Sequence, residues 1–196
     1  MITIVRGDEL GEPYRRAIAA VFTQGFAEDF SFFSKDPDVL ADAFAPMLLL
    51  EHFHVACVDG EPAGLATLTN GDQEVFDPSA ATLRRHLGPI RGTICYRVIR
   101  SWFMGPSDGV SHGATEIGSV TTVPRFRGRG VGTALLQHLI TLPGHSSFLL
   151  EDIKDTNGAA LGLYRKLGFS EDRRTPQRFP RLAGFTSLIS MRLDLE

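Results

Sequence analysis

The N-terminal part of the chain alternates between short β-prone runs and stretches in which apolar residues recur at helical spacing. Residues 2–6, ITIVR, form the first β-prone run. A helix follows from about residue 12, and Asp36-Pro37 opens a second one, because Pro is accepted in the first turn of a helix. Residues 54–58 and 63–68 are two predicted strands that flank Asp59-Gly60, a dipeptide that favours a tight turn. The pattern therefore predicts a pair of helices packed on the start of a sheet.

Residues 70–114 interrupt this order with a predicted helical insert. Asp77-Pro78-Ser79 can begin a helix that runs to Leu87, and a second helix follows Gly88-Pro89. Along the second helix an apolar stripe recurs every fourth residue, at Ile90, Ile94, Val98 and Trp102. Residues 104–113 are rich in Gly, Pro and Ser and are expected to form a loop.

The C-terminal part returns to alternating strands and helices. We predict strands over residues 116–123, 148–153 and about 189–195, and helices over about 131–142 and 158–167. The whole order is β-α-α-β-β-(insert)-β-α-β-α-β-β, without an internal repeat or a dividing linker. It predicts an α/β (α+β) fold that forms one domain over residues 1–196.

Composition and charge narrow the classes of function. Residues 1–120 hold nine basic and sixteen acidic side chains, whereas residues 121–196 hold eleven and seven. A basic half suits an anionic ligand and an acidic half suits a cationic substrate, although a chance imbalance of solvated charges explains the numbers equally well. The arginines are not interleaved with exposed aromatic residues, so we expect no nucleic-acid partner.

No membrane or oxidising compartment is indicated. Apolar runs stay well below the roughly 18–20 residues that cross a bilayer, and the start of the chain lacks a signal-peptide pattern. Cys57 and Cys95 stand in apolar surroundings without metal-ligand spacing, so we expect reduced core residues, no metal site and a cytoplasmic protein.

The most informative stretch is residues 116–132, EIGSVTTVPRFRGRGVG. A β-prone run is followed by a turn that contains Gly128, Gly130 and Gly132, and helical spacing begins directly afterwards. Unpaired N–H groups at such a helix start, together with the helix dipole, suit a phosphate or diphosphate. The turn lacks the Lys-Ser/Thr of a nucleotide-triphosphatase loop and does not follow the dinucleotide-binding pattern at a first βα unit. The residues alone predict a diphosphate-bearing ligand.

The same stretch resembles motif A of the GNAT N-acetyltransferases, as Arg127-x-x-Gly130-x-Gly132 preceded by Pro124. Residues 157–169, with Asn157, Ala160, Leu163-Tyr164 and Gly168-Phe169, are similar to motif B of that family. The resemblance is specific over residues 116–170, and the insert at 70–114 exceeds the short connection usual there. It implies a mixed, mostly antiparallel sheet of about six or seven strands, splayed between the fourth and fifth strands.

The resemblance also implies acetyl-CoA as the cofactor and a primary amine, on a small molecule or a peptide, as the acceptor. The diphosphate would lie on backbone amides of residues 127–132, and the pantetheine arm would run along residues 120–123. The cofactor contacts implied in this way are Val120, Thr121, Thr122, Val123, Arg127, Gly128, Arg129, Gly130, Val131, Gly132, Thr133, Asn157, Ala160 and Tyr164.

Three side chains are candidates for the catalytic proton transfers. An ammonium with a pKa of about 10.4 must lose a proton before it attacks, which requires a base or a water chain. Glu116 stands at the family's base spacing before Arg127, although a solvated strand residue is the alternative. Glu151 is a second candidate, as base or amine anchor, and strict alternation puts it on one face with Leu149 and Ile153. Tyr164 matches the family's general acid and is otherwise a core tyrosine.

Other functions and partners stay open from the sequence. A non-catalytic acyl-CoA-binding domain would keep the same glycine turn. The Trp102 stripe of the insert is a candidate lid or homodimer surface, and Phe30, Phe32, Phe33 and Trp102 are candidates for an apolar acceptor pocket or for core packing.

Overall fold

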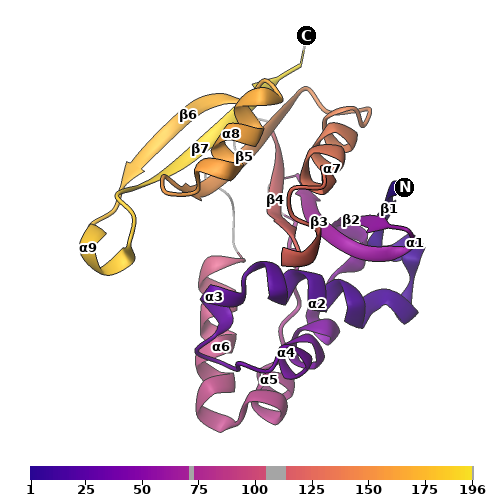
Figure 1. The fold of residues 1–196 in the computed structure, drawn as a ribbon. Helices are drawn as coiled ribbons and strands as arrows, with labels where there is room; N and C mark the ends of the chain where they lie inside the picture. The colour runs from indigo at the N-terminus through magenta and orange to yellow at the C-terminus, as the bar shows by residue number, and fades with distance from the viewer. Residues whose placement is uncertain (71–72, 105–113, 196) are drawn as a thin grey trace.

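The computed structural model describes residues 1–70, 73–104 and 114–195, apart from the side chain of Trp102. Its centre is a seven-stranded sheet in the order β1-β2-β3-β4-β5-β7-β6 (Figure 1). The strands are β1 Ile2–Arg6, β2 Phe53–Val58, β3 Glu61–Thr69, β4 Thr115–Thr122, β5 Ser147–Lys154, β6 Ser170–Pro176 and β7 Ser187–Asp194. β4 and β5 are parallel, and the other neighbouring strands are antiparallel. The predicted mixed, mostly antiparallel sheet is confirmed.

Helices occupy the predicted positions, and the described residues add three four-residue helices that the pattern does not predict, α1, α3 and α9. The α-helices are α1 Gly7–Leu10, α2 Arg15–Gly25, α3 Ala27–Phe30, α4 Pro37–Phe44, α5 Ala80–Leu87, α6 Pro89–Trp102, α7 Val131–Ile140, α8 Gly158–Lys166 and α9 Pro180–Ala183. Single 3-10 turns are η1 Glu12–Tyr14, η2 Ala45–Met47, η3 Leu50–His52 and η5 Pro124–Phe126. Within the described ranges, no helix combines the length and apolar character that crossing a bilayer requires.

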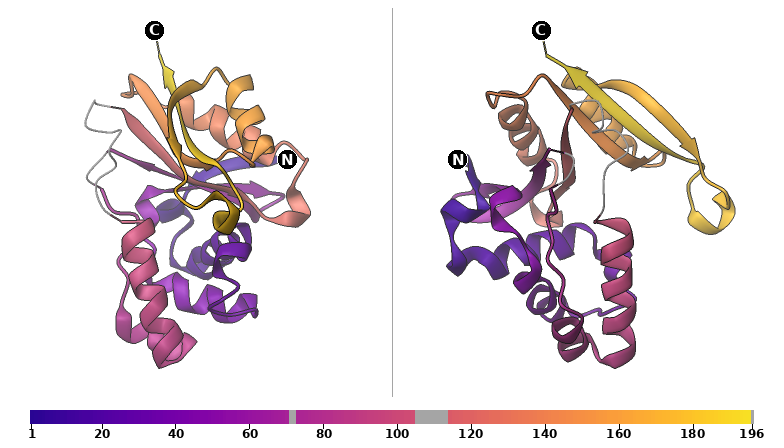
Figure 2. Two further views of the ribbon diagram at one scale, coloured as in Figure 1. Left: turned by 90° about the vertical axis from the view of Figure 1, so that its left-hand side faces the viewer. Right: turned by 180° about the vertical axis from the view of Figure 1, so that it is seen from behind.

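The helices form two layers on opposite faces of the sheet. α7 packs across β1 to β4 on one face, and α8 lies beside it over the C-terminal strands (Figure 1). α2 packs on the other face of β3 and β4, and α3 to α6 extend that layer away from the sheet (Figure 2). The two faces are called the α7–α8 face and the α2–α3 face below.

An aromatic cluster holds the α2–α3 layer together. Neighbouring ring centroids lie 4.7 to 6.5 Å apart, a distance at which aromatic pairs attract each other. Its members are Phe22, Phe26, Phe30, Phe44, Phe76 and Phe103. Phe30 is a core residue within this cluster and Phe33 is buried beside Phe32, whereas Phe32 itself is 60% exposed. The side chain of Trp102 lies outside the described residues.

The insert forms the predicted helix pair, and close contact between its helices decides which side of α6 is buried. Ser79 caps the start of α5, since its Oγ accepts a hydrogen bond from the Thr82 N–H at 3.3 Å. Cys95 and Ile99 are the buried residues of α6, while Ile90 is 74% and Ile94 38% exposed. Of the predicted stripe, Ile90 and Ile94 thus face outward, Val98 packs against the core, and the side chain of Trp102 is not described. The cause is Gly92, where a Cβ would lie 2.5 Å from the Leu83 carbonyl oxygen, so the two helices touch along the side of α6 that lacks bulk.

Both cysteines are free and buried in the core, as their surroundings predicted. Burial raises the pKa of the Cys95 thiol to about 12, so this residue is a neutral thiol at physiological pH.

Candidate functional site

A glycine turn joins β4 to α7, as the sequence predicted. Gly128 and Gly130 have φ values of +73° and +80°, a left-handed conformation that costs other residues about 1–2 kcal/mol. A Cβ added to either glycine would meet no atom within 4 Å, so the turn faces open space. α7 then starts at Val131, and the Ala134 N–H bonds the Gly130 carbonyl at 2.9 Å. The first N–H groups of α7 consequently point out of the helix end toward this space.

The three arginines around the turn differ in how they are held. Arg125 pairs with Glu61 on β3, which neutralises it. Arg127 donates from Nε to the Thr122 carbonyl oxygen at 3.2 Å, and the Arg129 guanidinium lies 5.1 Å from the centre of the Phe126 ring. Arg127 and Arg129 form no salt bridge among the described residues, and both are exposed beside the turn. The N-terminal ammonium is the main cause that lowers the pKa of the Asp59 carboxyl, and Arg129 lies near enough to lower it slightly further.

Directly beside the turn, the sheet is split between β4 and β5. The two strands pair at Thr115 with Phe148 and at Glu116 with Leu149, and then diverge. Each strand carries a bulge three residues later, with Ser119 at φ +51° and Asp152 at φ +53°. On β4, Ser119 and Val120 together oppose one residue of β3. On β5, Glu151 and Asp152 together oppose one residue of β7. Because a bulge bends its strand, the paired bulges open the split.

Contacts on either side of β4 show which way its side chains point. A Cβ on Gly25, at the end of α2, would lie 1.8 Å from Thr121 Oγ1, so the side chain of Thr121 lies on the α2–α3 face. Thr122 faces α7, where a Cβ on Gly132 would lie 3.7 Å from its Oγ1. Thr121 and Glu116 pair with Leu65 and Thr69 of β3, which are four residues apart and so share a face. Glu116 therefore also lies on the α2–α3 face. Its partner in register, Leu149, shares that face.

Glu151 is also on the α2–α3 face, but the predicted alternation is wrong beyond it. Leu150 and Ile153 oppose Met191 and Ile189 of β7 and so share the other face, because the bulge inserts one extra residue. Glu151 pairs with Arg173 of β6, with Nη2 to Oε1 at 3.0 Å. Strand β7 lies between them, and its residue opposite both is the small, buried Ser190.

The sequence gives no signal for Arg173, because β6 carries no recognisable motif. The structure brings Glu116 and Glu151 to the apex of the split, within two residues of the last paired register.

Tyr164 lies on α8 and is therefore on the α7–α8 face of the sheet, opposite the face that carries Glu116 and Glu151. It is 5% exposed, its ring lies 6.2 Å from that of Phe169, and burial raises the pKa of its phenol to about 12. The helix that carries it begins at Asn157, whose Oδ1 accepts a hydrogen bond from the Ala160 N–H at 3.2 Å. Asp155 fixes the same junction, since it accepts bonds from the Thr186 N–H and hydroxyl. Asp155 therefore ties the turn before α8 to the residue that precedes β7.

Helix α3 bridges the open end of the split on the α2–α3 face. Its start follows Gly25, which touches β4 at Thr121, and its Asp29 pairs with Lys154 at the end of β5, Oδ1 to Nζ at 3.4 Å. A ligand that approaches from this side therefore passes α3, whereas a ligand on the other side meets α7 and α8.

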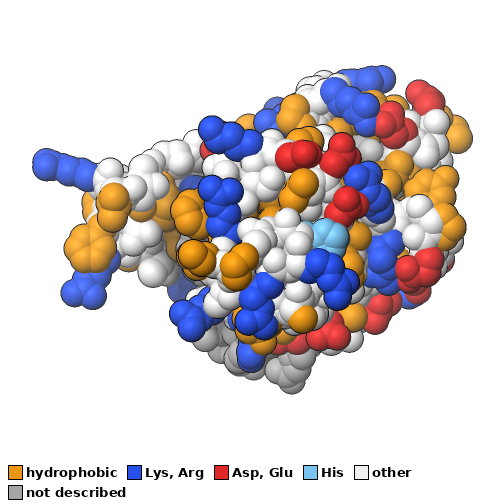
Figure 3. Space-filling view, turned by 90° about the horizontal axis from the view of Figure 1, so that it is seen from below, with side chains coloured by type: hydrophobic (Ala, Val, Ile, Leu, Met, Phe, Trp, Pro, Cys, Tyr) orange, Lys and Arg blue, Asp and Glu red, His pale blue; other side chains and the backbone are white. Residues whose placement is uncertain are grey.

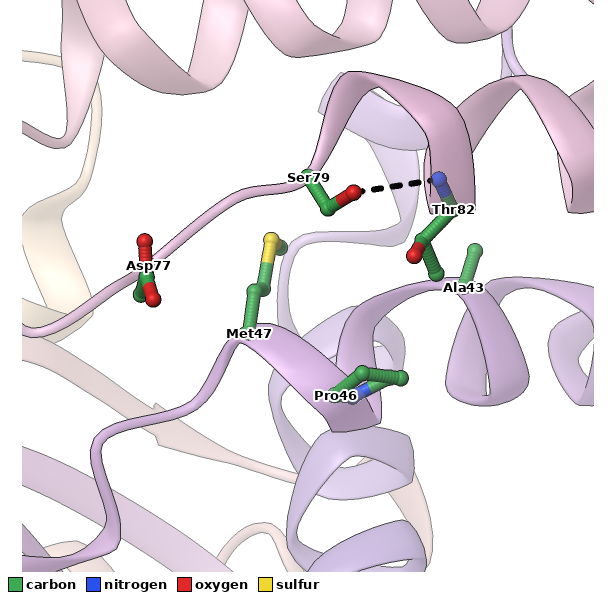
Figure 4. Close-up of a pocket in the computed structure, with 6 residues that line it drawn as sticks. All are labelled: Ala43, Pro46, Met47, Asp77, Ser79 and Thr82. Atoms are coloured by element: carbon green, nitrogen blue, oxygen red, sulfur yellow. Dashed lines mark hydrogen bonds between the residues drawn. The ribbon is translucent and has the colours of Figure 1, made fainter.

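The pocket in Figure 4 is separate from the split. It lies between the end of α4 and the start of α5, and is lined by Ala43, Pro46, Met47, Asp77, Ser79 and Thr82. Its volume of about 20 Å³ holds a single water molecule, so it cannot receive a cofactor or an acceptor.

The sequence matches the Acetyltransferase (GNAT) family over residues 20–169, which is most of the chain. The chain belongs to this family. A curated relative, Uncharacterized protein ML0378 of Mycobacterium leprae, is 35% identical over 65 residues; these cover 33% of this chain and 18% of that protein's length.

Solved structures share the GNAT fold over nearly the whole chain. An N-acetyltransferase of Staphylococcus aureus Mu50 has a TM-score of 0.64 at 19% identity, covering 97% of this chain and 100% of its own. The protein yncA of Salmonella typhimurium, described with its cofactor acetyl-CoA, has a TM-score of 0.59 at 20% identity, and the match covers 100% of this chain and 94% of yncA. At such identities the likeness establishes the fold alone. The predicted family and fold are thereby confirmed.

Proposed function

We propose that this GNAT family member transfers the acetyl group of acetyl-CoA to a primary amine. The observation that carries the proposal is the split between β4 and β5, which has the glycine turn and Tyr164 on one face and two carboxylates on the other. Family membership and the cofactor named for the yncA structure support the choice of donor.

The residues of the turn fit a coenzyme A diphosphate. The open space in front of Gly128 and Gly130 leaves room for it, and the first N–H groups of α7 supply donors with the positive end of the helix dipole. Arg127 and Arg129 are the cations beside them. Arg125 is excluded from this role, because Glu61 already pairs with it.

The inner edge of β4 fits an extended chain such as the pantetheine arm. Beyond Glu116, this edge is no longer paired with β5, so backbone N–H and C=O groups of residues 119–122 are open to a ligand in the split. We propose that they hold the arm in line and that an N–H of the bulge donates to the thioester carbonyl oxygen. Acetyl-CoA, when bound, supplies an activated acetyl group.

The amine would approach from the α2–α3 face, where both carboxylates lie. We propose Glu116 as the group that takes the proton from the ammonium, since it lies at the apex of the split. Glu151 already binds a cationic group, the Arg173 guanidinium, through Oε1. We assign it the anchoring of the ammonium instead. Much of the rate would come from holding the two reactants together.

Tyr164 would act as a hydrogen-bond donor to the departing sulfur. A phenol with a pKa of about 12 keeps its proton at every physiological pH, which suits a donor and excludes a base. Burial holds the pKa of this phenol well above the ordinary thiol value of about 8.5, so full proton transfer to the thiolate is uphill and the main effect of Tyr164 is to stabilise the developing charge.

A thiol-release assay with acetyl-CoA and a panel of small and peptide amines tests the function. Glu116→Gln should lower kcat most at neutral pH and recover toward high pH, where the amine deprotonates without help. Glu151→Gln should raise KM for the amine with a smaller effect on kcat. Calorimetry with acetyl-CoA separates the alternatives: absence of binding refutes the cofactor, and binding without turnover on any amine identifies an acyl-CoA-binding protein instead.

A further inference from the structure

The helix pair α5–α6 carries an unusual concentration of positive charge. Residues 78–104 contain five arginines and no acidic residue, although acidic residues outnumber basic ones in the whole chain. The five are Arg84, Arg85, Arg91, Arg97 and Arg100, and all are exposed. In the space-filling view from below, several basic side chains lie over this part of the molecule, and acidic side chains are seen toward the upper centre, the right and the lower edge of the same view (Figure 3).

These arginines have no acidic partners in the part of the chain that the structure describes. Elsewhere arginines typically pair with nearby acids, as Arg16 does with Asp38 and Asp42, and Arg174 with Glu171. On the insert, Arg84 bonds the Ala80 carbonyl and Arg100 bonds the Tyr96 hydroxyl, both on their own helices. The positive charge of the insert is therefore not neutralised within the described fold.

Apolar side chains are exposed between these charges. Ile90, Ile94 and Arg97 follow one another at i, i+4 and i+7, on the side of α6 opposite the buried Cys95 and Ile99. Arg91 flanks this stripe. A helix surface that combines aliphatic ridges with arginines resembles the composition of protein interfaces, where arginine is enriched.

We propose that the outer face of α5–α6 is a docking surface for an acidic polypeptide, best matched by an amphipathic helix with an apolar stripe between Asp or Glu side chains. The close packing of the pair at Gly92 keeps the surface rigid, so little ordering is needed on binding. α6 is 14 residues, or about 21 Å, long, which suits a partner helix of a few turns. This inference does not rest on the proposed acetyl transfer.

Two other occupants fit less well. A phosphate backbone would match the arginines but would gain nothing from Ile90 and Ile94. A second copy that presented its own α6 would bring like charges together, and the acids of α4 are already paired with Arg16. An acidic protein partner satisfies both the charge and the apolar stripe.

The test uses the full chain and a fluorescent peptide of about 20 residues, helical, with leucines in one stripe flanked by glutamates. Fluorescence anisotropy gives the Kd of the peptide for the wild type and for two double variants. The arginine variant carries Arg91→Glu and Arg97→Glu, and the isoleucine variant carries Ile90→Ser and Ile94→Ser. The matched control is the double variant Arg178→Glu with Arg181→Glu, which makes the same charge change just before and within the exposed α9. Circular dichroism shows that each variant is folded.

We expect binding that weakens between about 50 and 200 mM salt. The arginine variant should weaken it at least about tenfold and the isoleucine variant severalfold, while the control changes Kd less than about twofold. The proposal is overturned if the wild type does not bind the peptide, or if it binds a peptide with glutamine in place of every glutamate equally well. It is also overturned if the control variant loses as much affinity as the arginine variant. If duplex DNA binds more tightly than the peptide and the isoleucine variant does not change its Kd, the surface binds nucleic acid instead. If the chain forms salt-dependent dimers that the arginine variant abolishes, the surface binds a second copy of the chain.

Discussion

Replacement of Gly130 by alanine tests the glycine turn without disturbing the fold around it. The residue has φ +80°, so alanine costs about 1–2 kcal/mol in backbone energy. The added Cβ would meet no protein atom within 4 Å, so no steric cost is added. A loss of this size lowers the Tm of a chain of 196 residues by roughly 2–8 °C.

The effect on the cofactor should be larger, because the methyl group occupies the space that we assign to the diphosphate. Loss of one hydrogen bond to a charged group costs about 1.5–3 kcal/mol, which is about 10- to 150-fold in Kd. Calorimetry with acetyl-CoA measures this change directly.

Gly144→Ala is the matched control, because Gly144 has φ +89°, an equally open surrounding, and a position beyond the far end of α7. It should lower Tm by a similar amount and leave Kd unchanged. If Gly130→Ala binds acetyl-CoA as tightly as the control, the diphosphate does not lie on this turn.

Three further predictions concern chemistry, pH and packing. Tyr164→Phe should lower kcat about 10- to 150-fold, with KM little changed, in the thiol-release assay; an unchanged kcat contradicts its role as donor. His54 is buried, and desolvation lowers its pKa to about 4, so the unfolded chain binds the proton first. Stability should thus fall by up to about 3 kcal/mol between pH 6.5 and 4, and urea unfolding of His54→Gln should show a smaller fall. Gly25→Ala, with its Cβ 1.8 Å from Thr121 Oγ1, should cost about 1–3 kcal/mol, whereas Gly162→Ala, with no atom within 4 Å, should not lower Tm.

The order of elements and the glycine turn were predictable because their signals are local. Gly128 and Gly130 have the positive φ that only glycine adopts easily, and Asn157 caps α8 as its place before the helix predicts. Periodic apolar positions located the central helices and strands to within a residue or two.

The geometry of the split was not predictable, because no residue type marks it. Ser119 and Asp152 adopt positive φ without being glycine, and each does so where two neighbouring strands separate. The bulge at Asp152 changes which residues share a face with Glu151, and Arg173 reaches that acid from two strands away. On α6, the residue pattern did not show which side packs against α5, and Gly92 decides it by allowing close contact. Such outcomes depend on neighbours distant in sequence.

The short pairing between β4 and β5 also divides the molecule mechanically. Within the described strands, two residue pairs form the seam between the half-sheet β1 to β4 and the half-sheet β5 to β7. Structural units joined by few hydrogen bonds can open separately, so amides of the two halves are expected to exchange with solvent at different rates. A ligand that fills the split would tie the halves together. Its binding should therefore appear far from the site, as slower and more uniform hydrogen exchange across the whole sheet.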